Sequence, residues 1–201
     1  TEAPQEKRRQ KNQLETRDFL TNTEISRCRA AYRGVEVILF ETLLRTGLRA
    51  SELCALEVRD LGIYAGKRQI DVREGKGCKS RTVFVGPRIC EILGEHVQIG
   101  NPNAAVFHKQ DGKQISYSSL YYRIKCIARR SGLEELHPHS LRHTFLATLY
   151  NQDNDLKYVQ EQAGHSSIAT TQIYAKTFNE KKKAAMERLD SLFSKGHGKR
   201  T

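Results

Sequence analysis

The sequence contains no long hydrophobic run, and none of its apolar stretches approaches the roughly 18 residues of a membrane-spanning helix. Its first residues, TEAPQEKRRQKNQ, are charged and lack the apolar core of a secretory signal peptide. We therefore expect a chain that has no membrane partner and that works in the cytoplasm.

Paired cysteines and clustered metal ligands are missing as well. The five cysteines lie far apart, their number is odd, and no CxxC occurs; they are Cys28, Cys54, Cys78, Cys90 and Cys126. None has a Cys or His partner at the spacing of a zinc site, so we expect reduced thiols in a cytosolic protein. No Asp/Glu cluster suits magnesium, and the sequence predicts no metal and no cofactor.

Acidic residues are scarce relative to basic ones. The chain has 34 Lys and Arg against 23 Asp and Glu, which gives a formal net charge of +11 and a pI of about 9.6. A soluble chain this basic usually binds a polyanion, most often nucleic acid. A generically basic protein is the alternative that charge alone leaves open.

The 201 residues are enough for one domain with an appendage. We expect a linker or arm over residues 1–20 and a mainly helical α+β domain after it. Residues 57–86 contain short β-type runs separated by glycine turns, which predict a small three-stranded antiparallel sheet.

Local signals place the helices. Thr21 and Glu24 form a T-x-x-E capping box that starts a helix reaching about Tyr32, and GVEVILFETLLRT is a second helix that ends at Gly47. The remaining predicted helices cover ASELCAL, Pro87 to about His96, a stretch around Leu120–Ala128 ended by Gly132, LRHTFLATLYN capped by Ser140, LKYVQEQA capped by Asn154 or Asp155 and ended by Gly164, SIATTQIY capped by Ser166, and an apolar stripe from Ala185 to Phe193.

Several polar residues do not fit the apolar pattern of these elements. They lie in TGLRASEL, REGKGCKSR, HPHSLRHTF, AGHSS and TTQIY, and they are Arg49, Lys76, His139, Arg142, His165 and Tyr174. Taken singly, each has an ordinary structural explanation: a surface ion pair, a solvated turn, a helix cap or core packing. His139 and Arg142 are three apart and would share one face of a helix.

Taken together, two arginines, a lysine, two histidines and a tyrosine suit metal-free phosphoryl transfer on nucleic acid. Two guanidinium groups can grip the non-bridging oxygens of a phosphodiester and stabilise the charge of the transition state. A tyrosine hydroxyl can attack phosphorus, and a lysine can protonate the departing sugar oxygen.

These motifs, in this order, resemble those of the tyrosine recombinase (phage integrase) family, which includes lambda integrase, Cre and the Xer recombinases. The resemblance spans residues 21 to about 176, and it includes the family's H-x-x-R box and its interval of nine residues between histidine and tyrosine. It implies a domain order of 1–20 linker, 21–176 catalytic domain, and 177–201 C-terminal helix and basic tail.

The resemblance implies a role for each residue. Arg49 and Arg142 would bind the scissile phosphate, and His139 would contact it and help proton transfer. Glu52 matches an acidic family position that orients the first arginine. His143, beside the second arginine, would be structural.

The same resemblance assigns the covalent chemistry. Lys76 would protonate the leaving 5′ oxygen, and His165 would hydrogen-bond the phosphate. Tyr174 would attack, giving a 3′-phosphotyrosine intermediate and a free 5′ hydroxyl, and strands would be exchanged through a Holliday junction without ATP or metal.

The resemblance also implies partners. They are double-stranded DNA carrying specific sites, further copies of the chain in a tetrameric synaptic complex, and accessory DNA-bending or directionality proteins. The resemblance further implies that the chain works in the cytoplasm of a bacterium or archaeon, in association with the nucleoid. The family's core-binding domain is absent from this sequence, which predicts an excised catalytic domain. The stripe from Met186 to Phe193 would dock either on a neighbouring protomer or on its own domain.

Two alternatives remain. A type IB topoisomerase uses related Arg, Lys, His and Tyr chemistry, although the compact length and Xer-like spacing favour a recombinase. A non-catalytic DNA-binding protein could keep the fold, but all six positions are filled here. We favour integration or excision of a mobile element over chromosome resolution.

Overall fold

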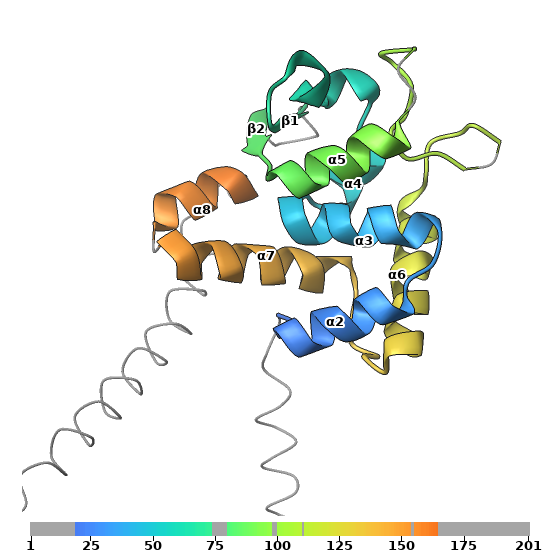
Figure 1. The fold of residues 1–201 in the computed structure, drawn as a ribbon, viewed down its shortest axis with the longest axis vertical. Helices are drawn as coiled ribbons and strands as arrows, with labels where there is room; N and C mark the ends of the chain where they lie inside the picture. Colours follow the sequence, from blue (N-terminus) through green and yellow to red (C-terminus); the bar gives the residue numbers. More distant parts are fainter. Residues whose placement is uncertain (1–18, 74–79, 98–99, 110, 154, 165–201) are drawn as a thin grey trace, which may run out of the picture. The chain divides into compact units, whose positions relative to one another are not determined.

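The computed structural model describes residues 19–73, 80–97, 100–109, 111–153 and 155–164 (Figure 1). The chain divides into two compact units, Thr1–Phe145 and Leu146–Thr201. In the part of the chain that is described, no helix is long and apolar enough to cross a membrane. The mainly helical α+β class with a small antiparallel sheet is confirmed.

The first two helices begin and end where the local signals predict. Helix α2 spans Asn22–Ala31, and its N-terminus is closed by the reciprocal capping box of Thr21 and Glu24. Helix α3 spans Val35–Thr46 and stops at Gly47, whose φ of 64° lies in the left-handed region that glycine adopts without strain. Gly47 therefore turns the chain within the TGLRASEL motif, two residues before Arg49.

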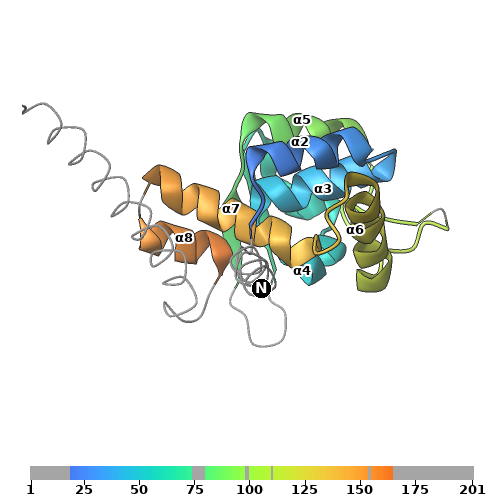
Figure 2. The same cartoon turned by 90° about the horizontal axis from the view of Figure 1, so that it is seen from below.

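The remaining helices of the first unit also match their predicted positions. Helix α4 covers Ala50–Ala55, α5 covers Pro87–His96 with proline in its first turn, and α6 covers Tyr117–Ser131. Helix α3 contacts α4, α5 and α6, while α2 contacts α6, and α3 lies beside α5 in both views (Figures 1 and 2). Aliphatic side chains of α3 and α6, among them Leu39, Leu43, Leu120 and Ile124, are therefore buried together in one core.

The prediction of a three-stranded sheet is wrong, because the described sheet has only two strands. Strands β1 (Gln69–Val72) and β2 (Arg81–Phe84) pair antiparallel, with Val72 opposite Arg81. The third β-type run instead forms two 3₁₀ helices, η1 (Val58–Asp60) and η2 (Gly62–Ala65), and only Leu61 bridges to β1.

The backbone hydrogen bonds of η1 explain this difference. The amides of Val58 and Arg59 donate to the carbonyls of Ala104 and Pro102, at 3.0 and 2.9 Å. Asp60 accepts from the amide of Glu57 at 2.9 Å and tightens the turn. Because these groups are satisfied by a distant loop and a local cap, they are not available for a ladder with β1.

Helix α7 spans Pro138–Asp153 and passes from the first unit into the second. The prediction that Ser140 caps it is wrong, because the helix begins two residues earlier. The amide of His137 donates to Ser140 Oγ at 3.3 Å, and the amide of Ser140 donates to His137 Nδ1 at 3.2 Å. His137 thus occupies the capping position, and Ser140 completes the reciprocal pair from inside the first turn.

The second unit contains helix α8, which covers Leu156–Ala163 and begins and ends as predicted. Asp155 caps it by accepting from the amides of Lys157 and Tyr158 at 2.8 and 3.2 Å. Gly164 ends it with a φ of 62°. The predicted helices over SIATTQIY and the Ala185–Phe193 stripe lie outside the described residues.

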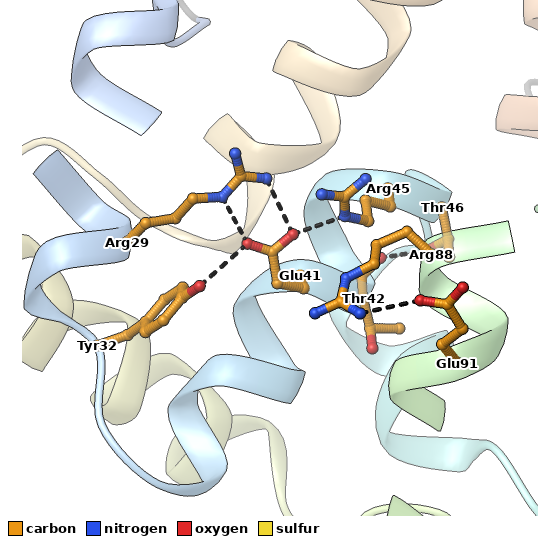
Figure 3. Close-up of polar contacts among 8 residues, drawn as sticks. All are labelled: Arg29, Tyr32, Glu41, Thr42, Arg45, Thr46, Arg88 and Glu91. Atoms are coloured by element: carbon orange, nitrogen blue, oxygen red, sulfur yellow. Dashed lines mark hydrogen bonds and ion pairs between the residues drawn. The ribbon is translucent and has the colours of Figure 1, made fainter. Parts of the chain in front are cut away.

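A buried carboxylate ties α2 to α3 (Figure 3). The Glu41 side chain is 4 % exposed, and its oxygens accept from Arg29 Nε at 2.7 Å and Arg45 Nε at 2.6 Å. Burial alone would raise the pKa of Glu41, but the two guanidinium groups outweigh burial and lower it below its ordinary value. The ionised carboxylate is therefore the stable form in the folded unit.

Candidate active site

The first unit contains a pocket of about 340 Å³ where the N-terminus of α4 meets the first turns of α6 and α7. Two arginines and a histidine that the sequence singles out line it together. Its principal polar and aromatic lining residues are Arg49, Ser51, Tyr117, His139 and Arg142. Positions far apart in the chain thus converge on one opening with a concentrated positive charge.

Arg49 reaches this pocket because of the turn at Gly47. The residue has extended backbone angles, φ −67° and ψ 150°, and immediately precedes α4. Its amide donates to Glu52 Oε2 at 2.7 Å, and its Nη1 donates to Glu52 Oε1 at 2.7 Å. The side chain remains 32 % exposed, so the guanidinium is both oriented by a carboxylate and accessible from the pocket.

Glu52 is held by a second arginine, Arg81, at the start of β2. Arg81 Nη1 and Nη2 donate to Glu52 Oε1 and Oε2 at 2.7 and 2.9 Å, in the bidentate geometry that guanidinium and carboxylate favour. Burial disfavours the charged form of Glu52, but the bonds from Arg81 and Arg49 outweigh burial and lower its pKa from 4.5 to about 2. The predicted orienting role of Glu52 thus has a direct contact with Arg49 to support it.

Arg142 approaches the pocket from inside the protein. It is 2 % exposed, and its Nη1 donates to the carbonyl oxygen of Gly47 at 2.6 Å. A buried guanidinium needs such acceptors, because it stays charged at any physiological pH. The same turn therefore positions both arginines: it delivers Arg49 along the chain and accepts a hydrogen bond from Arg142 across the core.

Three histidines at the start of α7 have rings in contact with one another, and one of them, His139, lines the pocket. The rings of His139 and His143, one helical turn apart, are 4.2 Å apart edge to face, and His137 stacks on His139 at 6.4 Å. His139 is exposed and lines the pocket, while His143 is half-buried. His139 and Arg142 both face this pocket, as the H-x-x-R spacing predicts.

The remaining predicted site residues lie outside the described part of the chain. They are Lys76, His165 and Tyr174, together with the C-terminal tail. Glu52, Arg49, His139 and Arg142 are the site residues whose surroundings the structure describes. Within the described ranges, no three His, Cys, Asp or Glu side chains gather as ligands for a metal ion.

Sequence reasoning missed two residues of the site: Arg81, which holds Glu52, and Tyr117, which lines the pocket. Arg81 had no special spacing and was part of a strand pattern. Tyr117 is 56 % exposed, lines the pocket and stacks on Tyr121 with centroids 6.2 Å apart. An exposed aromatic in the first turn of a helix could have been noticed, but nothing local connects it to an arginine 68 positions earlier.

Comparisons with known proteins agree with this geometry. The model of the phage integrase family matches residues 12–181. The tyrosine recombinase XerC of Pseudomonas entomophila (strain L48) is 39 % identical over 140 residues, which cover 68 % of this chain and 46 % of XerC. The chain thus spans about half the length of this curated relative.

Two solved structures are also similar. XerH site-specific recombinase bound to palindromic difH substrate, in a post-cleavage complex, aligns with a TM-score of 0.68 and 26 % identity, over 86 % of this chain and 53 % of XerH. The Tn1549 transposon integrase with transposon right end DNA aligns with a TM-score of 0.66 and 24 % identity, over 86 % of this chain and 66 % of the integrase, and that likeness concerns the fold alone. Given the family match over most of its length and the arginine–histidine pocket, the chain belongs to the phage integrase family of tyrosine recombinases.

Proposed function

We propose that this chain is the catalytic domain of a site-specific DNA recombinase, which cleaves and rejoins strands without a metal or cofactor. The observation that carries the proposal is the pocket in which Arg49, Arg142 and His139 converge. One guanidinium is buried and one is accessible, and the imidazole is exposed beside them. This combination suits a phosphodiester, whose non-bridging oxygens can accept from all three groups.

The proposed reaction keeps the energy of the phosphodiester bond. The phenolic oxygen of Tyr174 forms a bond to phosphorus, and the bond from phosphorus to the 5′ oxygen breaks. Lys76 gives a proton to that oxygen, while His139 helps the proton transfer by accepting the proton that the Tyr174 hydroxyl loses. His165 hydrogen-bonds the phosphate, and the two arginines stabilise the charge on its oxygens in the transition state.

Activation of the tyrosine is the main electrostatic requirement. At pH 7, deprotonating a phenol with a pKa near 10 costs about 4 kcal/mol, at about 1.4 kcal/mol per pH unit. Neighbouring guanidinium groups lower that cost by stabilising the phenolate. The phosphotyrosine is then attacked by the 5′ hydroxyl of a partner duplex, which restores Tyr174 and completes the exchange.

The proposed partners follow from this reaction. Exchange between two duplexes requires four active sites, so the functional assembly is a tetramer on two DNA sites that pass through a Holliday junction. We propose residues 21–176 as the catalytic domain, preceded by a linker and followed by a tail that docks within or between protomers. Accessory DNA-bending or directionality proteins would act on the same complex. The proposed location is the bacterial or archaeal cytoplasm, in association with the nucleoid.

The decisive experiment traps the covalent intermediate. The chain is incubated in EDTA with a duplex that carries its site and a nick next to it. After cleavage, the short fragment with the free 5′ hydroxyl diffuses away, so the strand cannot be religated. We expect a protein–DNA adduct that denaturing electrophoresis separates from free DNA. Tyr174→Phe should form none, whereas Tyr64→Phe, a change of an exposed tyrosine outside the pocket, should form it normally.

Three outcomes would contradict the proposal. An adduct in Tyr174→Phe would assign the nucleophile elsewhere, and loss of cleavage in EDTA with DNA binding intact would require a metal. Relaxation of one supercoiled circle without exchange between two duplexes would identify a type IB topoisomerase. Sequencing the junctions that the chain forms from intact duplexes then tests the proposed mobile-element role, because integration or excision joins element ends to a target, whereas chromosome resolution joins two copies of one site.

A further inference from the structure

We propose that Arg81 is a positioning residue, which holds Arg49 in its phosphate-binding orientation by fixing the carboxylate between them. The inference rests on the proposed function, because it concerns the same phosphodiester pocket. Arg81 does not line that pocket. It acts through Glu52, so its effect depends on Arg49.

The strand register explains why the Arg81 side chain is turned inward. Arg81 is the first residue of β2, opposite Val72, and it lies two positions before the buried Val83. Residues two apart in a strand share a face, so Arg81 lies on the inward face while Thr82 and Phe84 face solvent. Its side chain is consequently only 10 % exposed.

One carboxylate joins the two arginines. The side chain of Glu52 is 12 % exposed and accepts two hydrogen bonds from each partner, at distances between 2.7 and 2.9 Å. With Arg81 in place, both carboxylate oxygens are fixed by a rigid fork. The Nη1 of Arg49 then has a fixed carboxylate oxygen as acceptor, and Arg49 lines the pocket in that orientation.

Charge gives Arg81 a second effect. The cluster of two guanidinium groups and one carboxylate keeps a net charge of +1, so Arg49 remains attractive to a phosphate. Without Arg81, Glu52 and Arg49 would form a neutral pair, in which the carboxylate can rotate to bind Arg49 with both oxygens. Loss of Arg81 should therefore weaken both the attraction to the phosphate and the orientation of the group that binds it.

Arg73 offers a matched control on the same hairpin. It immediately follows β1 and donates to Asp60 Oδ2 at 2.8 Å, with Glu57 Oε1 at 3.2 Å. These partners hold the turn of η1, and none of them lines the pocket. Arg73→Ala thus removes an ion-paired arginine from the hairpin without touching Glu52.

The experiment compares single-turnover cleavage of the nicked site DNA by the full chain and its variants. Arg81→Ala should slow adduct formation by about 10-fold to 100-fold, the range seen when a partner that orients a ligand is removed. The rate of adduct formation by Arg73→Ala should stay within about twofold of the wild-type rate, because a site that does not interact with the pocket changes its energetics by no more than a few tenths of a kcal/mol. Arg81→Lys should lie between them, because an ammonium cannot contact both oxygens in the fork geometry.

A double-mutant cycle separates positioning from general loss of structure. In an Arg49→Lys background, Arg81→Ala should cost less than about twofold, because the group it positions is gone. Equal rates for the Arg81 and Arg73 variants, or an undiminished effect in the Arg49→Lys background, would overturn the inference while leaving the proposed function intact. A wild-type chain without any adduct would overturn the proposed function, and the inference with it.

Discussion

Replacing Glu52 by glutamine should destabilise the folded chain strongly at neutral pH and much less in acid. The two arginines hold the pKa of Glu52 at about 2, against 4.5 for the ordinary group. At about 1.4 kcal/mol per pH unit, this difference corresponds to about 3 kcal/mol of stability. The side chain is only 12 % exposed, so little of that value is lost to solvent screening.

The sign of the pH dependence follows from the direction of the difference. Because the folded-state pKa lies below the unfolded one, ionised Glu52 stabilises the fold fully above pH 4.5. This contribution is lost as the pH falls from 4.5 towards 2. The free energy of unfolding of Glu52→Gln should therefore be lower than that of the wild-type chain by about 3 kcal/mol at pH 7 and by about 1 kcal/mol at pH 3.

Urea denaturation followed by circular dichroism at the two pH values measures this deficit. Glu91→Gln is the control, because Glu91 forms an exposed ion pair with Arg88 within one turn of α5 (Figure 3). Its side chain is 58 % exposed, and an exposed, solvent-screened pair of this kind contributes little to the free energy of unfolding. A deficit for Glu52→Gln that matches the control, or that is equal at pH 7 and pH 3, would refute the reasoning.

Two further changes, one of them with a control at Gly66, test the fold of the first unit. Gly47→Ala should destabilise the chain by about 2 kcal/mol or more and impair adduct formation, because a Cβ there would lie 2.3 Å from the Phe145 ring and the turn holds Arg142. Gly66→Ala, with a similar φ of 72° but open space around it, should cost only about 1 kcal/mol in the same urea titrations. Glu41→Gln should destabilise the chain at pH 7, but by less than the about 3 kcal/mol of a fully buried ion pair, because the two arginines that lose their partner are 39 % and 35 % exposed. That deficit should shrink in acid, because the pKa of Glu41 is lowered in the folded chain, and thermal unfolding at both pH values would show it.

The helices were predictable because their signals are local. A capping box at Thr21, a proline at the start of α5 and glycines after α3, α6 and α8 each act within a few residues of the boundary they set. The same applies to the H-x-x-R spacing, which needs only one helical turn to bring His139 and Arg142 together. The error at Ser140 was also local, because a histidine served as the cap in its place.

Tertiary structure decided the features that depend on contacts between distant segments. The third strand was lost because the amides of Val58 and Arg59 bond to a loop more than 40 residues later. Arg81 looks like any strand residue until the register turns it inward to Glu52, 29 positions earlier. Sequence alone thus determined where the described helices form, and it supplied the residues on which the proposed chemistry rests. Only long-range packing decided how the carboxylate of Glu52 and the carbonyl of Gly47 aim two arginines at one pocket, because neither contact follows from local spacing.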